Sequence, residues 1–313
     1  MMQKTNFPFE VLIHDDASTD HTADIIREYE AKYPDVIKPI YQTENQHSKN
    51  VRISIVYNYS RAQGKYIALC EGDDFWCNPK KLQTQYDFME SHPDYSLCAS
   101  NFALLDEFNR TLTYSHPNRD LAKTLDREKR VSEILINGAI YRTASLLFRK
   151  DKYELCVPEI IRDSNIAKCG DFPLQLHLAR HGKIKYFEDA FIVYRVHQNS
   201  ASNYNNRKQA WRNYFSVGKK RRRVAILNGY DTLCGDIASR HNRLILNLLI
   251  SSGFFCRAKR FADKHKFGCS YIGMSFKWCV FGLKTSILKW RRLVIGRRQY
   301  NALKKNPKSL NMI

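Results

Sequence analysis

Residues 65–76 read KYIALCEGDDFW, an apolar run that leads into three acidic side chains around one glycine. The run predicts a short buried strand, with Glu71, Asp73 and Asp74 at its end. Gathering carboxylates in one place costs free energy unless a partner offsets their charge. Mg²⁺ and Mn²⁺ prefer oxygen ligands and complete their shells with water and substrate phosphates. The stretch therefore indicates a divalent-cation site, or else a solvated acidic turn that caps the next helix.

The chain around this stretch alternates strand and helix patterns. Strands are predicted at 9–16, 35–42, 65–74 and 95–105, and helices at 18–34, 51–64 and 79–94. This order with short connections predicts an α/β domain with a mostly parallel sheet. Ligands bind at the carboxyl ends of strands in such sheets. We therefore expect Asp15 and Asp16, which follow one strand, to share a rim with the acidic cluster that follows another.

Basic residues are concentrated in the last third of the chain. The net charge is +20 over 313 residues, yet residues 1–204 carry 26 Lys and Arg against 28 Asp and Glu. Residues 205–313 carry 25 basic and only three acidic residues. This asymmetry predicts two units, an α/β domain at 1–204 and a basic helical region at 205–313. Helical patterns in the second unit lie around 236–251 and 254–266.

The bulk composition excludes several classes of protein. A chain with 43% hydrophobic and 12% aromatic residues can bury a core and is not of a disordered composition. Nine cysteines without a CxxC pair indicate reduced thiols, as in the cytoplasm. No apolar run reaches the roughly 18 residues of a membrane-spanning helix. The start, MMQKTNFPFE, has no apolar segment of the kind found in signal peptides.

Three segments in this order resemble the family 2 inverting glycosyltransferases of the GT-A fold. They are VLIHDDASTDHTADII at 11–26, AQGKYIALCEGDDFWCNPKKLQTQYDFME at 62–90 and CGDFPLQLHLARHGKIKYFEDAFIVYRVHQNSAS at 169–202. They match the family's D-D-x-S-x-D-x-T strand end, its A-x-G-x-Y segment with a DxD-type motif, and its later Y-R-x-H block. The resemblance covers about residues 9–203. It implies transfer of a sugar, with inversion, from a nucleotide-diphosphate donor, expected to be UDP-linked.

The resemblance implies further expectations about substrates and partners. The acceptor would be a glycan or a lipid-linked glycan in the synthesis of a bacterial surface polysaccharide. A catalytically inactive homologue remains an alternative, and so does a basic protein that binds nucleic acid. The run KKRRR at 219–223 suits an anionic partner, but no zinc-finger or RNP-type motif supports nucleic acid.

The resemblance assigns four residues to nucleotide-sugar binding. Asp16 matches the position that contacts the base, and Asp15 and Ser18 would shape the same loop. Asp73 matches a position near the ribose. The plainer interpretation of the segment from Ser18 onward is that it caps the following helix, and both interpretations can hold together.

Cation and diphosphate binding are assigned to three more residues. Asp74 matches the ligand of a Mn²⁺ or Mg²⁺ ion that bridges the two phosphates. His197 matches the position that closes over the diphosphate or the metal, and Arg195 is a weaker candidate for the same role. Without the motif, His197 would be interpreted as a surface histidine. His177 and His181 are spaced like metal ligands, but we interpret both as ordinary residues of a helix surface.

Asp171 is the expected catalytic base. It lies at the start of a helical run that ends near Gly182, where the helix dipole favours an ionised carboxylate. An ionised carboxylate can accept the proton of the acceptor hydroxyl. The family's usual Glu-Asp pair is here Gly170-Asp171. The alternative role of Asp171 is that of a simple helix cap.

One family segment has no counterpart in this sequence. The family domain begins with a strand of the form V-S-V-I-x-P-[TV]-Y-N, whereas MMQKTNFPFE resembles the segment after the first helix. A sheet without that interior strand leaves backbone groups unpaired. Part of the core would be exposed as well, so the resemblance predicts the fold, while a truncated, inactive homologue remains an alternative for the activity.

The stretch FKWCVFGLKTSILKWRRLVIGRR at 276–298 predicts a basic amphipathic helix. Its apolar stripe comprises Phe276, Val280, Leu283, Ile287, Trp290 and Val294. Aromatic and basic residues on one such helix are typical of segments that lie on a membrane. We expect residues 274–298 either to contact anionic membrane or to pack on the catalytic domain. The expected location is the cytoplasm, with peripheral contact at the inner face of the cytoplasmic membrane.

Overall fold

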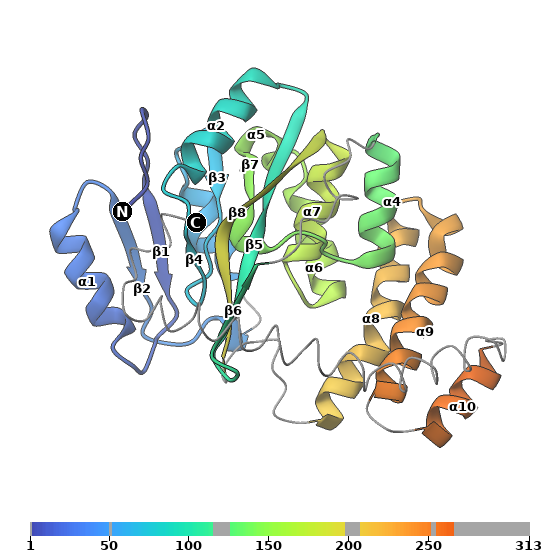
Figure 1. The fold of residues 1–313 in the computed structure, drawn as a ribbon. Coiled ribbons are helices and arrows are strands. Elements are labelled where there is room, and N and C mark those ends of the chain that lie inside the picture. Colours follow the sequence, from blue (N-terminus) through green and yellow to red (C-terminus); the bar gives the residue numbers. More distant parts are fainter. Residues whose placement is uncertain (1, 50–51, 115–125, 198–206, 252–254, 266–313) are drawn as a thin grey trace.

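The computed structural model describes residues 2–49, 52–114, 126–197, 207–251 and 255–265 and contains two separate sheets (Figure 1). In the first, β1 (Val11–Asp15) and β2 (Ile37–Tyr41) run parallel. The second has six strands in the order β3 (Tyr66–Ala68), β7 (Leu147–Arg149), β5 (Tyr95–Asp106), β8 (Lys183–Val196) and β4 (Phe75–Trp76), with β6 (Thr111–Tyr114) paired to β5. Among the described residues no strand pairing joins the two sheets.

The strand pairing confirms the α/β class and shows that the sheets are mixed. Among the described residues, β1 with β2 and the long β5 with β8 are parallel, while the other four, shorter pairings are antiparallel. Parallel neighbours need a long crossover connection. The turn between β5 and β6 is too short for one, so these strands form a hairpin. β7 lies between β3 and β5 although it comes later in the chain than both. No strand was predicted from the sequence in that segment.

The helices mostly lie where the sequence places them. They are α1 (Thr22–Lys32), α2 (Lys81–Ser91), α4 (Arg127–Asn137), α5 (Lys150–Glu154), α6 (Val157–Ala167), α7 (Asp171–Arg180), α8 (Arg207–Leu227), α9 (Cys234–Ser251) and α10 (Phe255–Lys264). The helix expected at 51–64 is instead a π turn at Ser54–Asn58 and a 3₁₀ turn at Tyr59–Arg61. Its β-branched residues favour helix weakly, which explains the shorter and irregular element.

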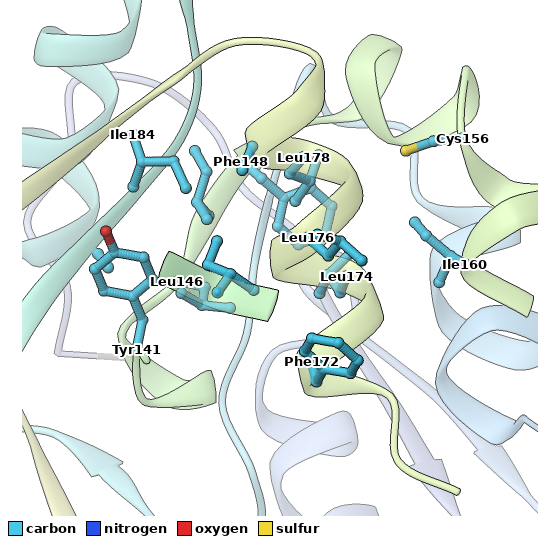
Figure 2. Packing of buried hydrophobic residues seen from close by; sticks show 14 of the residues in the cluster. Tyr141, Leu146, Phe148, Cys156, Ile160, Phe172, Leu174, Leu176, Leu178 and Ile184 are labelled. Carbon is cyan, nitrogen blue, oxygen red and sulfur yellow. The ribbon is translucent and has the colours of Figure 1, made fainter. Parts of the chain in front are cut away.

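The main core surrounds α7, the helix that begins at Asp171. Every residue from Phe172 to Ala179 is buried, so this helix has no solvent-facing side over those turns. Figure 2 shows apolar side chains of α7 beside those of β7 and the neighbouring helices. A helix enclosed in this way has little freedom to shift. The core therefore fixes the position of the residue at its N-terminus.

The first helices of the basic region pack into the same core. Val224 and Ala225 of α8 and Ile237 of α9 are fully buried within it. Arg221, in the middle of the KKRRR run, is also buried, and its Nη1 donates to the carbonyl oxygen of Ile136 at 2.6 Å. Part of that basic run is therefore structural rather than an exposed patch. The predicted boundary near residue 204 stays a prediction.

The segment at 274–298 lies outside the described residues. Within the parts of the chain that the structure describes, no helix combines the length and the apolar character needed to cross a membrane.

Candidate functional site

Asp74 lies in the turn between β3 and β4 and is buried. Its Oδ1 accepts a hydrogen bond from the backbone N–H of Arg195, on β8, at 2.9 Å. Its Oδ2 is buried with no hydrogen-bond partner. Burial raises the pKa of the Asp74 carboxyl, and the Arg195 N–H and two nearby guanidinium groups only partly offset that effect. An orphaned carboxylate oxygen in such a place suits a cation.

The other predicted residues of this loop and of β8 lie beside Asp74. The Nε2 of His197 lies 3.4 Å from the Oδ2 of Asp73. The guanidinium of Arg195 forms an ion pair with Glu107, with 2.7 Å between nitrogen and oxygen. Arg195 therefore contributes its backbone to the cluster, while its side chain is already paired. His197 and Asp73 thus form a contact next to the residue that carries the buried carboxylate.

Asp171 belongs to the same cluster although it comes from a distant helix. It is the first residue of α7, and its Oδ1 accepts the N–H of Phe172 at 2.8 Å. Burial and the negative charges of Asp74, Asp73 and Asp171 together raise the pKa of the Glu71 carboxyl to about 7. The fold thus gathers four carboxylates from the strand-end loop and the start of α7. The sequence placed Glu71 in the acidic stretch but assigned it no role.

The loop at 140–146 is a part of the site that the sequence did not predict. α4 ends at Gly138, whose φ of 89° favours glycine, and the chain then turns into the loop. The Oε1 of Gln175, on α7, accepts the N–H groups of Ile140 and Tyr141 at 3.0 and 3.1 Å. Further along, Thr143 donates a hydrogen bond to Glu71. The loop therefore connects α7 to the acidic cluster.

A buried lysine supports this loop from beneath. Lys81 is fully buried, and its Nζ donates to the Oε1 of Gln85 at 2.8 Å and lies 4.2 Å from the ring centroid of Trp76. Gln85 in turn donates to the carbonyl oxygen of Ser145, and the Nε1 of Trp76 donates to that of Ala144. Burial lowers the pKa of Lys81 to about 8. Nothing in the sequence distinguishes Lys81 from Lys80, the exposed lysine just before the same helix.

The second group of predicted site residues lies at the end of β1, where hydrogen bonds and burial hold the chain in place. The two carboxylate oxygens of Asp16 accept the N–H groups of Gln46 and His47 at 2.7 and 3.0 Å. Asp15 is buried, and its Oδ1 has no partner. Ala17 has a φ of 60°, a left-handed conformation that costs a non-glycine residue free energy. Strain of this kind is typical of loops that are shaped for a ligand.

Ser18 is exposed and does not cap the following helix. The carboxylate of Asp20 instead accepts the N–H of Thr22 at 3.0 Å. No hydrogen bond or ion pair between described residues links Asp15, Asp16 or Ser18 to the acidic cluster. The structure thus brings together Asp73, Asp74, Asp171, Arg195 and His197, and places the other three on the separate sheet.

The interpretation of His177 as a helix-surface residue is wrong. Its side chain is 1% exposed, and its Nε2 lies 2.8 Å from the Oδ2 of Asp163, which is fully buried on α6. The same oxygen accepts the Nδ2 of Asn228, just after α8, at 2.8 Å. Burial alone would raise the pKa of Asp163, but hydrogen bonds from His177, Arg162 and Asn228 lower it to about 2. This network fastens α7 to its neighbours.

The donor set at this site fits a divalent cation in part. Among the described residues, no three His, Cys, Asp or Glu side chains are arranged to hold a metal ion. Asp74 offers one free buried oxygen, and Asp73 and His197 lie next to it. This partial set fits a cation that takes its remaining ligands from phosphate and water, as Mg²⁺ and Mn²⁺ commonly do.

Residues 2–154 match the family model described as Glycosyl transferase family 2. The segment at residues 2–154 belongs to this family of glycosyltransferases. The matched residues include Asp15, Asp16, Asp73 and Asp74. The roles of Asp171, Arg195 and His197, which lie beyond the match, rest on the motif resemblance and on geometry, and all the site assignments stay predictions. The predicted family is thus confirmed.

Individual relatives agree with the family. An uncharacterized protein of Mycobacterium tuberculosis is 33% identical over 218 residues, which cover 67% of this chain and 57% of that protein. The putative glycosyltransferase EpsE of Bacillus subtilis is 38% identical over 100 residues, or 32% of this chain and 34% of its own. The Escherichia coli UDP-Glc:alpha-D-GlcNAc-diphosphoundecaprenol beta-1,3-glucosyltransferase WfaP is 31% identical over 116 residues, or 37% of this chain and 43% of its own. The chain thus spans less than two thirds of these relatives.

Proposed function

We propose that this glycosyltransferase moves a sugar from a UDP-linked donor to a glycan or lipid-linked acceptor, with inversion at the anomeric carbon. The observation that carries the proposal is the cluster of four carboxylates, with a buried, unpartnered oxygen on Asp74 and with Asp171 at the start of an enclosed helix. The name of WfaP specifies a UDP-sugar donor and a lipid-linked acceptor, which supports the proposed substrate classes.

Each group of residues has a part in the reaction. Asp74 and His197 would hold a Mn²⁺ or Mg²⁺ ion, which offsets the negative charge of the diphosphate when bound. Asp73 would lie near the ribose. Asp171 accepts the proton of the acceptor hydroxyl as that oxygen bonds to the anomeric carbon. The bond from that carbon to the diphosphate oxygen breaks, and its electron pair leaves with UDP. Attack on the face opposite the leaving group inverts the anomeric configuration.

The other residues of the site bind and position the donor. Asp16 would contact the nucleotide base at the strained turn after β1, and Asp15, which has a buried oxygen without a partner, would shape that turn. Ser18 would shape the same turn. The backbone N–H of Arg195 orients Asp74, and its ion pair with Glu107 anchors the end of β8. The core around α7 keeps Asp171 beside the loop.

Asp74→Asn is expected to weaken UDP binding in the presence of Mn²⁺ by at least about 10-fold, because the amide keeps the shape but loses the charge that a cation needs. Isothermal titration calorimetry of UDP with and without Mn²⁺ measures the effect. Asp151→Asn, an exposed carboxylate on α5, is the matched control and should bind as the unaltered chain does. Equal, Mn²⁺-dependent affinity of the Asp74→Asn variant would refute the metal assignment.

The same proposal places the chain in the cytoplasm and at the inner face of the cytoplasmic membrane through residues 274–298. Co-sedimentation with liposomes should rise with the content of phosphatidylglycerol and fall with salt, because attraction to anionic lipid is about 1 kcal/mol per Lys or Arg and is screened. Trp290→Glu should weaken the binding at any salt concentration. Lys284→Glu combined with Arg291→Glu should weaken it mainly at low salt. If the chain does not bind anionic liposomes at low salt, the apolar stripe of residues 274–298 packs against protein instead.

A further inference from the structure

Arg142 is an exposed cation on the 140–146 loop to which the proposed mechanism gives no role. Its guanidinium carbon lies 4.2 Å from the ring centroid of Tyr194, on β8, and 4.9 Å from that of Phe102, on β5. The two rings pack edge to face, with centroids 6.3 Å apart. Stacking uses the flat face of a guanidinium and leaves its edge, which carries the N–H donors, available for a ligand.

The loop holds this guanidinium in a fixed place beside the acidic cluster. Gln175 binds the two residues before Arg142, and Trp76 and Gln85 bind the two carbonyl groups after Thr143. Thr143 itself donates to Glu71, and the positive charge of Arg142 acts on the carboxyl of Asp74. The residues on both sides of Arg142 are therefore anchored, and its charge lies near enough to Asp74 to act on that carboxyl.

The pairing of charges in the site leaves Arg142 available. Arg195 is held by Glu107, and the ammonium of Lys81 is buried beneath the loop. Within the described part of the chain, no carboxylate forms an ion pair with Arg142, and its N–H groups donate to no described residue. A preorganised, exposed arginine with unused donors is well suited to an oxyanion such as phosphate.

We propose that Arg142 binds the terminal phosphate of the nucleoside diphosphate, the group that gains negative charge when the sugar leaves. This role rests on the proposed function, since it requires a nucleotide-diphosphate donor. The guanidinium would contact the phosphate from the side of β5 and β8, while Asp74 and His197 would hold the cation. Charge that develops on the leaving group is then balanced by the cation and by a protein side chain.

Comparing UDP with UMP tests this role, because UMP lacks the terminal phosphate. In calorimetry with Mn²⁺, Arg142→Ala should weaken UDP binding by about 10- to 100-fold, the scale of one charge-assisted hydrogen bond. Its affinity for UMP should stay within about threefold of the unaltered chain. Arg142→Lys, which keeps the charge but not the forked geometry, should fall between the two. Arg127→Ala, on the exposed face of α4, removes the same charge elsewhere and should change neither affinity.

The outcomes separate this inference from the proposed function. If the unaltered chain and the Arg142→Ala variant bind UDP equally, the role of Arg142 is refuted while the donor class stands. If the variant loses UDP and UMP affinity alike, Arg142 shapes the site rather than binding the terminal phosphate. If the unaltered chain binds neither nucleotide with Mn²⁺, the proposed donor is wrong and the role of Arg142 is refuted with it. The melting temperatures of both Arg142 variants, measured in parallel, should match that of the unaltered chain.

Discussion

Asp171→Asn is expected to slow sugar transfer by about 10²- to 10⁴-fold, the usual contribution of a general base. The amide is nearly the same size and can still accept the N–H of Phe172, so the start of α7 should stay in place. It cannot take up a proton at neutral pH. UDP affinity should remain within about twofold, because the proposed contacts with the nucleotide come from other residues. Release of UDP from UDP-glucose, UDP-galactose and UDP-N-acetylglucosamine, with lipid-linked acceptors from bacterial membranes, measures the turnover.

The control for Asp171→Asn is Asp151→Asn, which removes an exposed carboxylate at the start of a different helix and should leave turnover unchanged. If Asp171→Asn keeps near-normal turnover, Asp171 only begins the helix. A loss of turnover that accompanies an equal loss of UDP affinity would also contradict the assignment, because it would make Asp171 part of the donor site.

Asp163→Ala is expected to lower the free energy of unfolding by about 3–5 kcal/mol, the usual cost of removing one partner from a buried ion pair. The substitution leaves His177, Arg162 and Asn228 without their shared acceptor. Urea unfolding followed by circular dichroism measures the effect. Asp151→Ala, whose carboxylate is largely exposed, should change the free energy by no more than about 0.5 kcal/mol. A change that small for Asp163→Ala would mean that the network does not fasten α7.

The same carboxylate gives a pH signature. The pKa of Asp163 in the folded chain is about 2, below its ordinary value of 3.8. A depressed carboxyl pKa stabilises the fold above the unfolded value, and that stabilisation is lost as the pH falls through the folded value. Between about pH 4 and pH 2 the unaltered chain should therefore lose more stability than Asp163→Asn. Parallel losses in urea titrations over this range would contradict the assigned network.

The sequence predicted the features that depend on local pattern. Apolar runs that end in acids located β1 and β3, and the motif order placed Asp171 at the start of a helix. Two of these features, the acidic loop after β3 and Asp171 at the start of α7, lie near enough in the folded chain for the charge of Asp171 to act on Glu71. The local pattern of apolar residues was informative here because each motif comes directly after one strand or directly before one helix.

The features that escaped prediction depend on packing between distant segments. The sequence favoured a surface position for His177, but α7 is enclosed by helices from both halves of the chain, so the imidazole is buried against Asp163. Arg221 lies in a run of five basic residues, yet the packing of α8 turns it into the core. The loop at 140–146 carries no motif, because its role depends on anchors from α2 and α7. None of these three features can be recognised from a repeating pattern of apolar residues along the chain.

The central claim is that Asp74 and its neighbours hold a cation that carries the donor diphosphate. The most direct test is a crystal of the full chain grown with UDP and Mn²⁺, with anomalous diffraction recorded to locate manganese. We expect an anomalous peak about 2.0–2.2 Å from the Oδ2 of Asp74, in contact with the phosphates of UDP. Nucleotide bound without manganese at Asp74, or manganese bound only elsewhere on the chain, would contradict it.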